Sequence, residues 1–456
     1  MRETNLAYLR PALSFLVKNK ALHYPLFRNF LLVRISIILA LNMQSAIVSY
    51  FVYYKLTFNA STQSGDPLVL GMLGLCEVIP AIGVSLFSGH FVDLKEKRTL
   101  MMQCIFGYIL LSAFFVFLAW PHLQEVLPRH KIVWLVYIGI FIGGALRAFI
   151  GPSSFALQGM LVPRELYPNA TTWSSTAWQM GAVFGPLMGG FMMPLVGYQA
   201  SIVGVGVVEI IALIAIIRIP KQAILKKEKE AILKSLGEGL KFVFRNQLIL
   251  AALSLDMFAV LFGGAVALLP VYALDILKVG EIGFGWMRAA PGIGSVIALF
   301  ILSFLPLKKH AGIKLLLGIA GFGITTIIFG YCGAFGVGKI ASIAGFGISW
   351  GFLVAFGMLL AGGMFDAVSV VIRGTILQLY TPDSMRGRVA AVNTMFISSS
   401  NELGAMESGI TARWMGTVPA VVFGGCMTLV VVGVTWFAAP MLRKLTLHAE
   451  SKKAHG

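Results

Sequence analysis

The sequence predicts an all-α integral membrane protein with about twelve transmembrane helices in two pseudo-symmetric six-helix bundles. Of its 456 residues, 58% are hydrophobic and only 12% are charged, whereas soluble domains carry about a quarter charged residues. Apolar runs recur at the roughly 20 residues that a helix needs to cross a hydrocarbon core. A short internal repeat relates the first six runs to the last six.

The predicted spans share this length and composition. They cover 29–54, 67–89, 99–120, 132–160, 170–194, 199–218, 247–275, 283–306, 314–333, 342–379, 388–411 and 417–440. The tenth run is too long for one helix, so we expect its helix to start nearer residue 350, after a loop. The resulting organisation is a tail 1–28, a bundle 29–218, a linker 219–246, a bundle 247–440 and a tail 441–456.

The distribution of basic residues predicts the orientation in the membrane. Of the 36 Lys and Arg residues, 26 flank the spans on one side and 6 on the other, with four inside spans. Positive residues favour the cytoplasmic side, so both termini are expected there, in a bacterial inner membrane. The net charge of +17 therefore reflects topology rather than nucleic-acid binding. The Lys/Glu-rich linker suits an amphipathic helix on the cytoplasmic surface.

The internal repeat is carried by short motifs at equivalent spans. Gly74, Glu77, Pro80 and Gly83 of the second span align with Gly285, Arg288, Pro291 and Gly294 of the eighth. A second match, near the fourth and tenth spans, places Arg147 on Asp366. Two parallel repeats place a substrate cavity between them near the bilayer midplane. Glu77 and Arg288 hold equivalent positions with opposite charges and are predicted to act in gating.

Ionisable groups inside spans are costly in lipid and are commonly functional. The deepest are Arg147, Asp256, Asp366, Glu402 and Glu407, which we predict to couple transport to protons. Asp256 is the leading carrier, Asp366 the next, and Arg147 the switching cation. The same groups would also suit fixed ion pairs between helices. Arg34 and Glu209 are expected nearer the membrane surfaces.

A large amphipathic solute would be bound by amide and aromatic side chains. Residues of this kind occur in the first, fifth and eleventh spans. The predicted cavity residues are Asn42, Gln44, Trp173, Trp178, Asn393 and Asn401.

Three motifs resemble those of the major facilitator superfamily. The loop after the second span contains Gly89, Asp93 and Arg98, similar to the Gly-x3-Asp conformational latch of that family, with Glu96 where Gly is usual. The fifth span resembles the family's antiporter motif at Gly181, Gly185, Pro186, Gly189 and Gly190. The fourth span resembles the family motif in which an arginine, here Arg147, assists proton coupling.

Longer stretches are similar to the drug:H⁺ antiporter-3 branch, which includes enterobactin exporters and macrolide efflux carriers. They include Phe27–Phe30, Leu236–Val243 and Met287–Pro291. The resemblance implies a proton-driven exporter working by alternating access, with a siderophore as the first substrate class and a drug or macrolide as the second. It implies a bilayer, a small solute and protons as partners, with the chain as a monomer.

Other functions remain open at this stage. A lysophospholipid flippase or a proton-coupled importer fits the same fold, and an intramembrane enzyme is a remote alternative. The sequence contains no P-loop and no His-Glu-x-x-His motif, which argues against ATP-driven transport and zinc hydrolysis. We therefore expect no enzymatic activity, no cofactor, no metal and no nucleic-acid partner.

Overall fold

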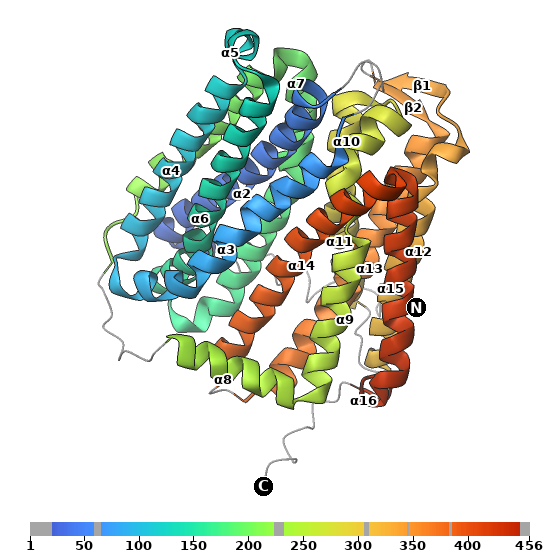
Figure 1. The fold of residues 1–456 in the computed structure, drawn as a ribbon. Coiled ribbons are helices and arrows are strands. Elements are labelled where there is room, and N and C mark those ends of the chain that lie inside the picture. The colour runs from blue at the N-terminus through green and yellow to red at the C-terminus, as the bar shows by residue number, and fades with distance from the viewer. Residues whose placement is uncertain are drawn as a thin grey trace, which may run out of the picture.

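The computed structural model describes residues 21–58, 65–222, 232–304, 310–343, 346–382 and 385–446. Within these ranges the chain is almost entirely helical (Figure 1). Helices suit so apolar a chain because they satisfy every backbone hydrogen bond within one segment, which lipid cannot do.

The first half of the chain contains five long helices. They are α2 (Pro25–Phe51), α3 (Pro67–Leu94), α4 (Lys97–Leu118), α6 (Arg129–Leu161) and α7 (Tyr167–Ile217). A π-helical segment η2 (Val52–Leu56) extends α2, and the short α5 (Pro121–Val126) follows α4. The 3₁₀ turns η1 (Ala21–His23) and η3 (Arg164–Leu166) precede α2 and α7.

The second half begins after helix α8 (Ile232–Arg245). Its long helices are α9 (Gln247–Gly263), α11 (Gly280–Phe304), α12 (Ala311–Gly330), α13 (Trp350–Tyr380), α14 (Arg386–Met415) and α15 (Thr417–Ala438), followed by the short α16 (Pro440–Arg443). After α9 the seventh span continues through η4 (Ala265–Leu268), α10 (Leu269–Val271) and the π-helical η5 (Tyr272–Ile276). The 3₁₀ turn η6 (Cys332–Phe335) follows α12.

The predicted number of membrane-crossing helices is confirmed among the described residues. Ten segments are long and apolar enough to cross a membrane. One of them, α7, is two helices, because Gly197 interrupts it with φ +80° where the sequence predicts the fifth span to end. The twelfth crossing is α14, which is more polar than the other crossings because residues 398–402 read Ser-Ser-Ser-Asn-Glu.

The region before the tenth span differs from the predicted loop. Strands β1 (Lys339–Ile343) and β2 (Phe346–Ser349) pair antiparallel, with Ile343 opposite Phe346. Helix α13 then begins at Trp350, as expected for the shortened tenth span, and Ser349 caps it by accepting a hydrogen bond from the Phe352 N–H. The β-branched and aromatic residues of 339–349 favour a hairpin, which the continuous apolar run concealed.

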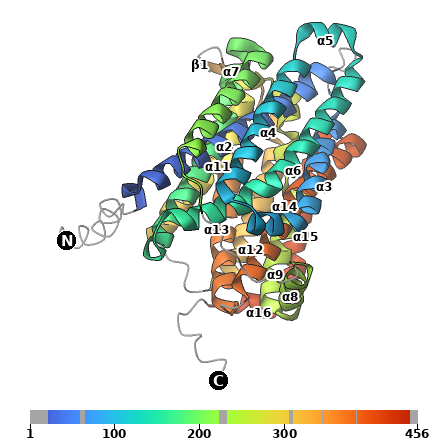
Figure 2. The ribbon, with the colours of Figure 1, turned by 90° about the vertical axis from the view of Figure 1, so that its left-hand side faces the viewer.

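The two halves lie side by side and meet along two helix pairs. Helix α3 packs on α14, and α7 packs on α11. In Figures 1 and 2, α8 and α16 lie at one end of the molecule (the α8 end), and α5 and the hairpin lie at the other (the α5 end). Small residues form the contacts near the α5 end, where Gly190 meets Gly285 and Gly71 meets Gly409. Such residues let helix backbones approach closely in a membrane.

Candidate functional site

A cluster of opposite charges joins the two halves in the middle of the helices. Arg147 of α6 forms an ion pair with Glu77 of α3, and its Nη1 lies 3.7 Å from an Oε of Glu402 on α14. Arg147 is surrounded by protein atoms, yet 57% of its side-chain surface is open. The cluster therefore lies at the contact between the halves, with the Arg147 side chain still accessible.

The position of the Arg147–Glu77 pair follows from how α3 and α6 cross. At Gly144 the two backbones touch, and a Cβ there would collide with the carbonyl oxygen of Glu77 and the ring of Pro80. Arg147 lies one helical turn from this contact and faces Glu77. Glycine at 144 therefore sets the distance at which the two charges meet.

A fourth charge approaches the same cluster from the second half. Arg288 of α11 donates a hydrogen bond of 2.9 Å to the Ser45 hydroxyl of α2, and it lies within electrostatic range of Glu77 and Glu402. Four charged residues from α3, α6, α11 and α14 thus share one region between the halves. The sequence assigned Glu77 and Arg288 to gating and Arg147 and Glu402 to proton coupling, and the fold brings the two groups together.

The leading sequence candidate, Asp256, lies elsewhere. It is buried in the second half, where it forms an ion pair with Arg373 of α13 and accepts a hydrogen bond of 3.4 Å from Ser369. Both partners belong to the same half, which fits the fixed interhelical ion pair that the sequence left open as the alternative. A role of Asp256 in proton coupling stays a prediction. Glu407 of α14 is half-buried next to Thr411.

The predicted cavity residues are dispersed. Gln44 is buried and donates to the Ser112 hydroxyl at 3.1 Å, so it ties α2 to α4. Asn42 and Asn401 each donate to a backbone carbonyl of their own helix, those of Ile38 and Ile397. Asn393 and Trp173 are half-buried, and Trp178 is 49% exposed. Their role in binding a solute stays a prediction.

The glycines of the predicted antiporter motif pack α7 against two helices. Gly181, Gly185 and Gly189 face α2, and Gly190 faces Gly285 of α11. Pro186 is buried in the same helix, where its backbone oxygen approaches Gly285. The motif therefore packs α7 against α2 within the first half and against α11 at the contact between the halves.

The predicted loop motif is described only in part. Gly89 and Asp93 belong to helix α3, but their surroundings lie outside the description. Arg98 donates hydrogen bonds to the carbonyl oxygens of Ile216 and Ile217, and so ties the start of α4 to the end of α7.

Glu209 and Arg34 were both expected nearer the membrane surfaces, and the structure shows a buried environment for Glu209. Glu209 is fully buried between α7 and its neighbours rather than at a membrane surface, and its carboxyl oxygens have no hydrogen-bond partner among the described residues. Arg34 donates to Ser154 at 2.8 Å and to the carbonyl of Ser174 at 3.0 Å. Hydropathy locates a charge along a helix, but it does not show which helices cover it.

Sequence reasoning also missed the polar contacts that close the α5 end. Tyr53 of η2 donates to Asp275 of η5, and Tyr198 of α7 lies 3.1 Å from the Glu281 carboxylate of α11. We call these two contacts the tyrosine–carboxylate latch. A π-helical segment ends both the first and the seventh span, and this repetition of a rare geometry marks equivalent positions of the repeat.

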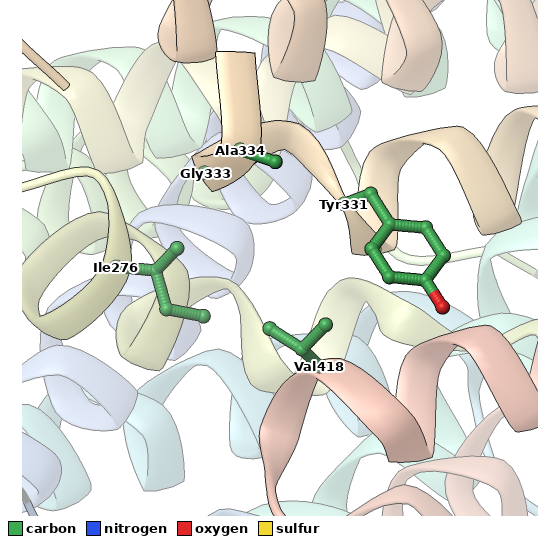
Figure 3. Close-up of a pocket in the computed structure, with 6 residues that line it drawn as sticks. Ile276, Tyr331, Gly333, Ala334 and Val418 are labelled. Carbon is green, nitrogen blue, oxygen red and sulfur yellow. The ribbon is translucent and has the colours of Figure 1, made fainter. Parts of the chain in front are cut away.

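One pocket of 290 Å³ lies at the α5 end, inside the second half. Figure 3 shows Ile276 of η5 and Val418 of α15 facing it, with Tyr331, Gly333 and Ala334 around it. Its lining carries no ionisable acid or base besides the tyrosine hydroxyl. The charge cluster between the halves is therefore the better candidate for the transport site.

Comparison with known proteins agrees with this geometry. The family model described as Major Facilitator Superfamily matches residues 127–362, a little over half of the chain. The chain belongs to the Major Facilitator Superfamily. As a member of that superfamily it is a multi-pass membrane transporter, and the resemblance noted from its motifs is confirmed.

This facilitator is similar to two curated bacterial proteins over most of its length. The MFS-type transporter YfiS of Bacillus subtilis (strain 168) is 23% identical over 385 residues, covering 82% of this chain and 86% of that protein. The enterobactin exporter EntS of Escherichia coli O1:K1 / APEC is 23% identical over 354 residues, covering 76% of this chain and 77% of that protein.

Solved facilitator structures share the fold. The POT family transporter PepTSo matches with a TM-score of 0.69 and 13% identity, covering 93% of this chain and 99% of that one. The inward-open xylose transporter XylE from E. coli matches with a TM-score of 0.64 and 15% identity, covering 90% of this chain and 96% of that one. At such low identity these matches show the fold alone.

Proposed function

We propose that this facilitator is a proton-driven exporter of an amphipathic small molecule, and that the proton is carried by Glu402. The proposal rests on the position of Arg147. Arg147 forms an ion pair with Glu77 in its own half, and its Nη1 lies 3.7 Å from an Oε of Glu402 in the other half. A relative motion of the two halves must therefore change the electrostatic surroundings of Glu402.

The sign of this change suits inward proton movement. With the α5 end closed, Glu402 lies near the guanidinium groups of Arg147 and Arg288 and near the carboxylate of Glu77. Positive neighbours favour the ionised carboxylate, and burial favours the protonated acid. When the halves separate at the α5 end, Glu402 leaves both members of the Arg147–Glu77 pair. We propose that loss of the Arg147 cation dominates, so that Glu402 holds a proton more readily. Glu402 thus gains a proton from the α5 side and loses it on the α8 side.

The direction follows from the orientation proposed for the chain. The excess of Lys and Arg flanking the spans at the α8 end favours the cytoplasm for that end, in an inner membrane with both termini inside. The latch closes the α5 end, and we take this conformation to be the one that exchanges with the cytoplasm at the α8 end. Proton entry from outside then drives solute outward.

The substrate class rests on similarity. The relative EntS is named an enterobactin exporter, so a catecholate siderophore comes first and a drug or macrolide second. All of these are large amphipathic molecules. The four charges at the cluster have no net charge, which suits a solute bound mainly by apolar and aromatic contacts.

The test uses purified protein in liposomes with an internal pH dye and an imposed proton gradient. Catecholate siderophores, macrolides and lysophospholipids are added in turn to wild type, to Glu402→Gln and to Glu125→Gln. The last is a matched control, because Glu125 is exposed on α5 with His122 as its neighbour. We expect substrate-dependent proton flux in wild type and in the control, and its loss in Glu402→Gln.

Two other outcomes would contradict the proposal. Substrate movement without proton flux in wild type would indicate a facilitator or a lipid flippase. Proton flux that persists in Glu402→Gln would move the proton site to another carboxyl, with Asp366 and Glu407 next.

A further inference from the structure

Helix α8 has one face packed on the bundle and one face exposed. On the packed face, Gly239 lies against the backbone of α14 and Val243 is fully buried. Lys241, Phe244 and Arg245 are exposed, Phe244 to 60%. At 3.6 residues per turn, these three side chains point away from the packed face. The exposed face of α8 therefore carries an aromatic ring between two cations.

A second group of the same kind lies next to it. In Figures 1 and 2 the end of α8 that leads into α9 lies beside α16, and α16 packs on α9. Arg443 of α16 lies over the Trp436 ring, with its Cζ 5.1 Å from the ring centroid, and Lys444 is exposed. Phe437 and Met441 are 83% and 61% exposed. Cations again lie beside large exposed apolar side chains.

No acid in these segments balances the cations. The described stretches 239–255, 310–335 and 417–446 contain neither Asp nor Glu. Glu238, the only acid of α8, forms an ion pair with Arg388 of α14. Helix α12 adds a further cation, because it begins at this end and packs on α16. The resulting basic surface consists of Lys241, Arg245, Lys314, Arg443 and Lys444.

We propose that the basic surface binds the headgroups of anionic phospholipids in the membrane leaflet at the α8 end. Helices α9 and α12 begin there and α15 ends there, which places the surface at the level of the headgroups. Clustered Lys and Arg residues at this level attract anionic headgroups. Phe244, Phe437 and Met441 suit contact with the adjoining acyl chains, and Trp436 is of a type enriched at this depth.

The combination of side chains favours a lipid over a soluble anionic partner. A free phosphate compound would leave the three exposed apolar side chains in water, whereas a phospholipid covers them and neutralises the cations together. Helix α8 contacts α3 of the first half and α14 of the second. A lipid bound here therefore holds the helix between the two halves against the membrane surface. This inference does not depend on the transported solute or on proton coupling.

The test counts the phospholipids that stay bound to the full chain. The protein is purified from liposomes with equal amounts of phosphatidylglycerol and phosphatidylcholine that have the same acyl chains, and bound lipids are counted by native mass spectrometry. The test variant combines Arg245→Gln, Arg443→Gln and Lys444→Gln. A second variant with Arg245→Lys and Arg443→Lys keeps the charges.

The matched control combines Arg28→Gln, Arg218→Gln and Lys221→Gln. It removes three exposed cations at the same end but on the first half. We expect wild type to retain phosphatidylglycerol in preference to phosphatidylcholine. The test variant should lose this preference by about fivefold for each cation removed, while the control and the lysine variant stay near wild type. Retention of phosphatidylcholine should be equal in all chains.

Two results would overturn the proposal. Equal retention of both lipids by wild type would show that the surface does not select anionic headgroups. An equal loss of phosphatidylglycerol in the test variant and in the control would show attraction by the overall positive charge rather than a site on the second half.

Discussion

The Tyr53 hydroxyl donates a hydrogen bond to the carboxylate of Asp275, and this contact joins the end of the first span to the end of the seventh. Tyr198 and Glu281 make a second contact of the same kind between the halves. In both, a tyrosine of the first half meets a carboxylate of the second. The latch therefore stabilises the conformation that is closed at the α5 end.

The first prediction concerns the two tyrosine hydroxyls. Hydrogen bonds to charged groups contribute about 1.5–3 kcal/mol each, and Tyr53→Phe with Tyr198→Phe removes both without emptying space. We expect a clear rise in the fraction open at the α5 end, measured by spin-label distances between positions 126 and 337. Tyr331→Phe is the control, since Tyr331 lies at the same end and is 53% exposed. An equal rise in the control would contradict the role of the latch.

The second prediction concerns the close contact between α7 and α11. A Cβ at Gly190 would lie 2.7 Å from the Gly285 Cα and 2.8 Å from the Glu281 carbonyl oxygen. Gly190→Ala should therefore push the helices apart and favour the open state. Gly433→Ala in α15 is the matched control for Gly190→Ala, because nothing lies within 4 Å of the Cβ position at Gly433. That change should raise helix stability by up to about 1 kcal/mol and leave the open fraction unchanged.

A third prediction separates structure from proton coupling at Asp256. Because Asp256 and Arg373 are paired and buried, Asp256→Asn leaves a buried cation without its anion and should cost about 3–5 kcal/mol. Thermal unfolding in detergent should show a marked fall in midpoint. The double change Asp256→Leu with Arg373→Leu should recover most of it. A stable Asp256→Asn chain without proton flux would instead restore Asp256 as the carrier.

The fourth prediction is a pH dependence at the start of α4. The Glu96 carboxylate caps this helix, accepting from the Thr99 N–H at 2.8 Å, the Arg98 N–H at 3.1 Å and the Gln222 N–H at 3.1 Å. Burial alone would raise the pKa of Glu96, but these hydrogen bonds and that of the Thr99 hydroxyl outweigh it and lower the pKa. This capping role also explains why the chain can carry glutamate at position 96, where the loop motif of the superfamily usually has glycine.

The sign of the effect follows from the lowered pKa. The contribution of Glu96 to stability is complete above the ordinary glutamate pKa of about 4.3 and is lost as the pH falls through the lower pKa of the folded state. Glu96→Gln should lower the unfolding midpoint at neutral pH, by the equivalent of about 1 kcal/mol. The difference should shrink as the pH falls below about 4. A constant difference down to acid pH would exclude this explanation.

Particular residues show where sequence reasoning succeeded and where it stopped. The Pro80 and Pro291 motifs indicated equivalent spans, and both prolines occupy matching helix crossings. Asp256 ranked first among the acids because it lies deep in an apolar run, and the sequence did not show that Arg373 neutralises it. Glu209 was expected near a surface, and packing against neighbouring helices buries it fully.

The sequence by itself determined the membrane-crossing helices, the interruption near Gly197 and the superfamily. These features depend on local composition, because lipid demands apolar residues and internal backbone hydrogen bonds in every span. The tertiary structure alone decided which charges meet. Glu77, Arg147, Arg288 and Glu402 come from four helices far apart in the chain, and their distances depend on glycine contacts and on the closure of the α5 end. Partners across helices are set by three-dimensional packing, which hydropathy does not encode.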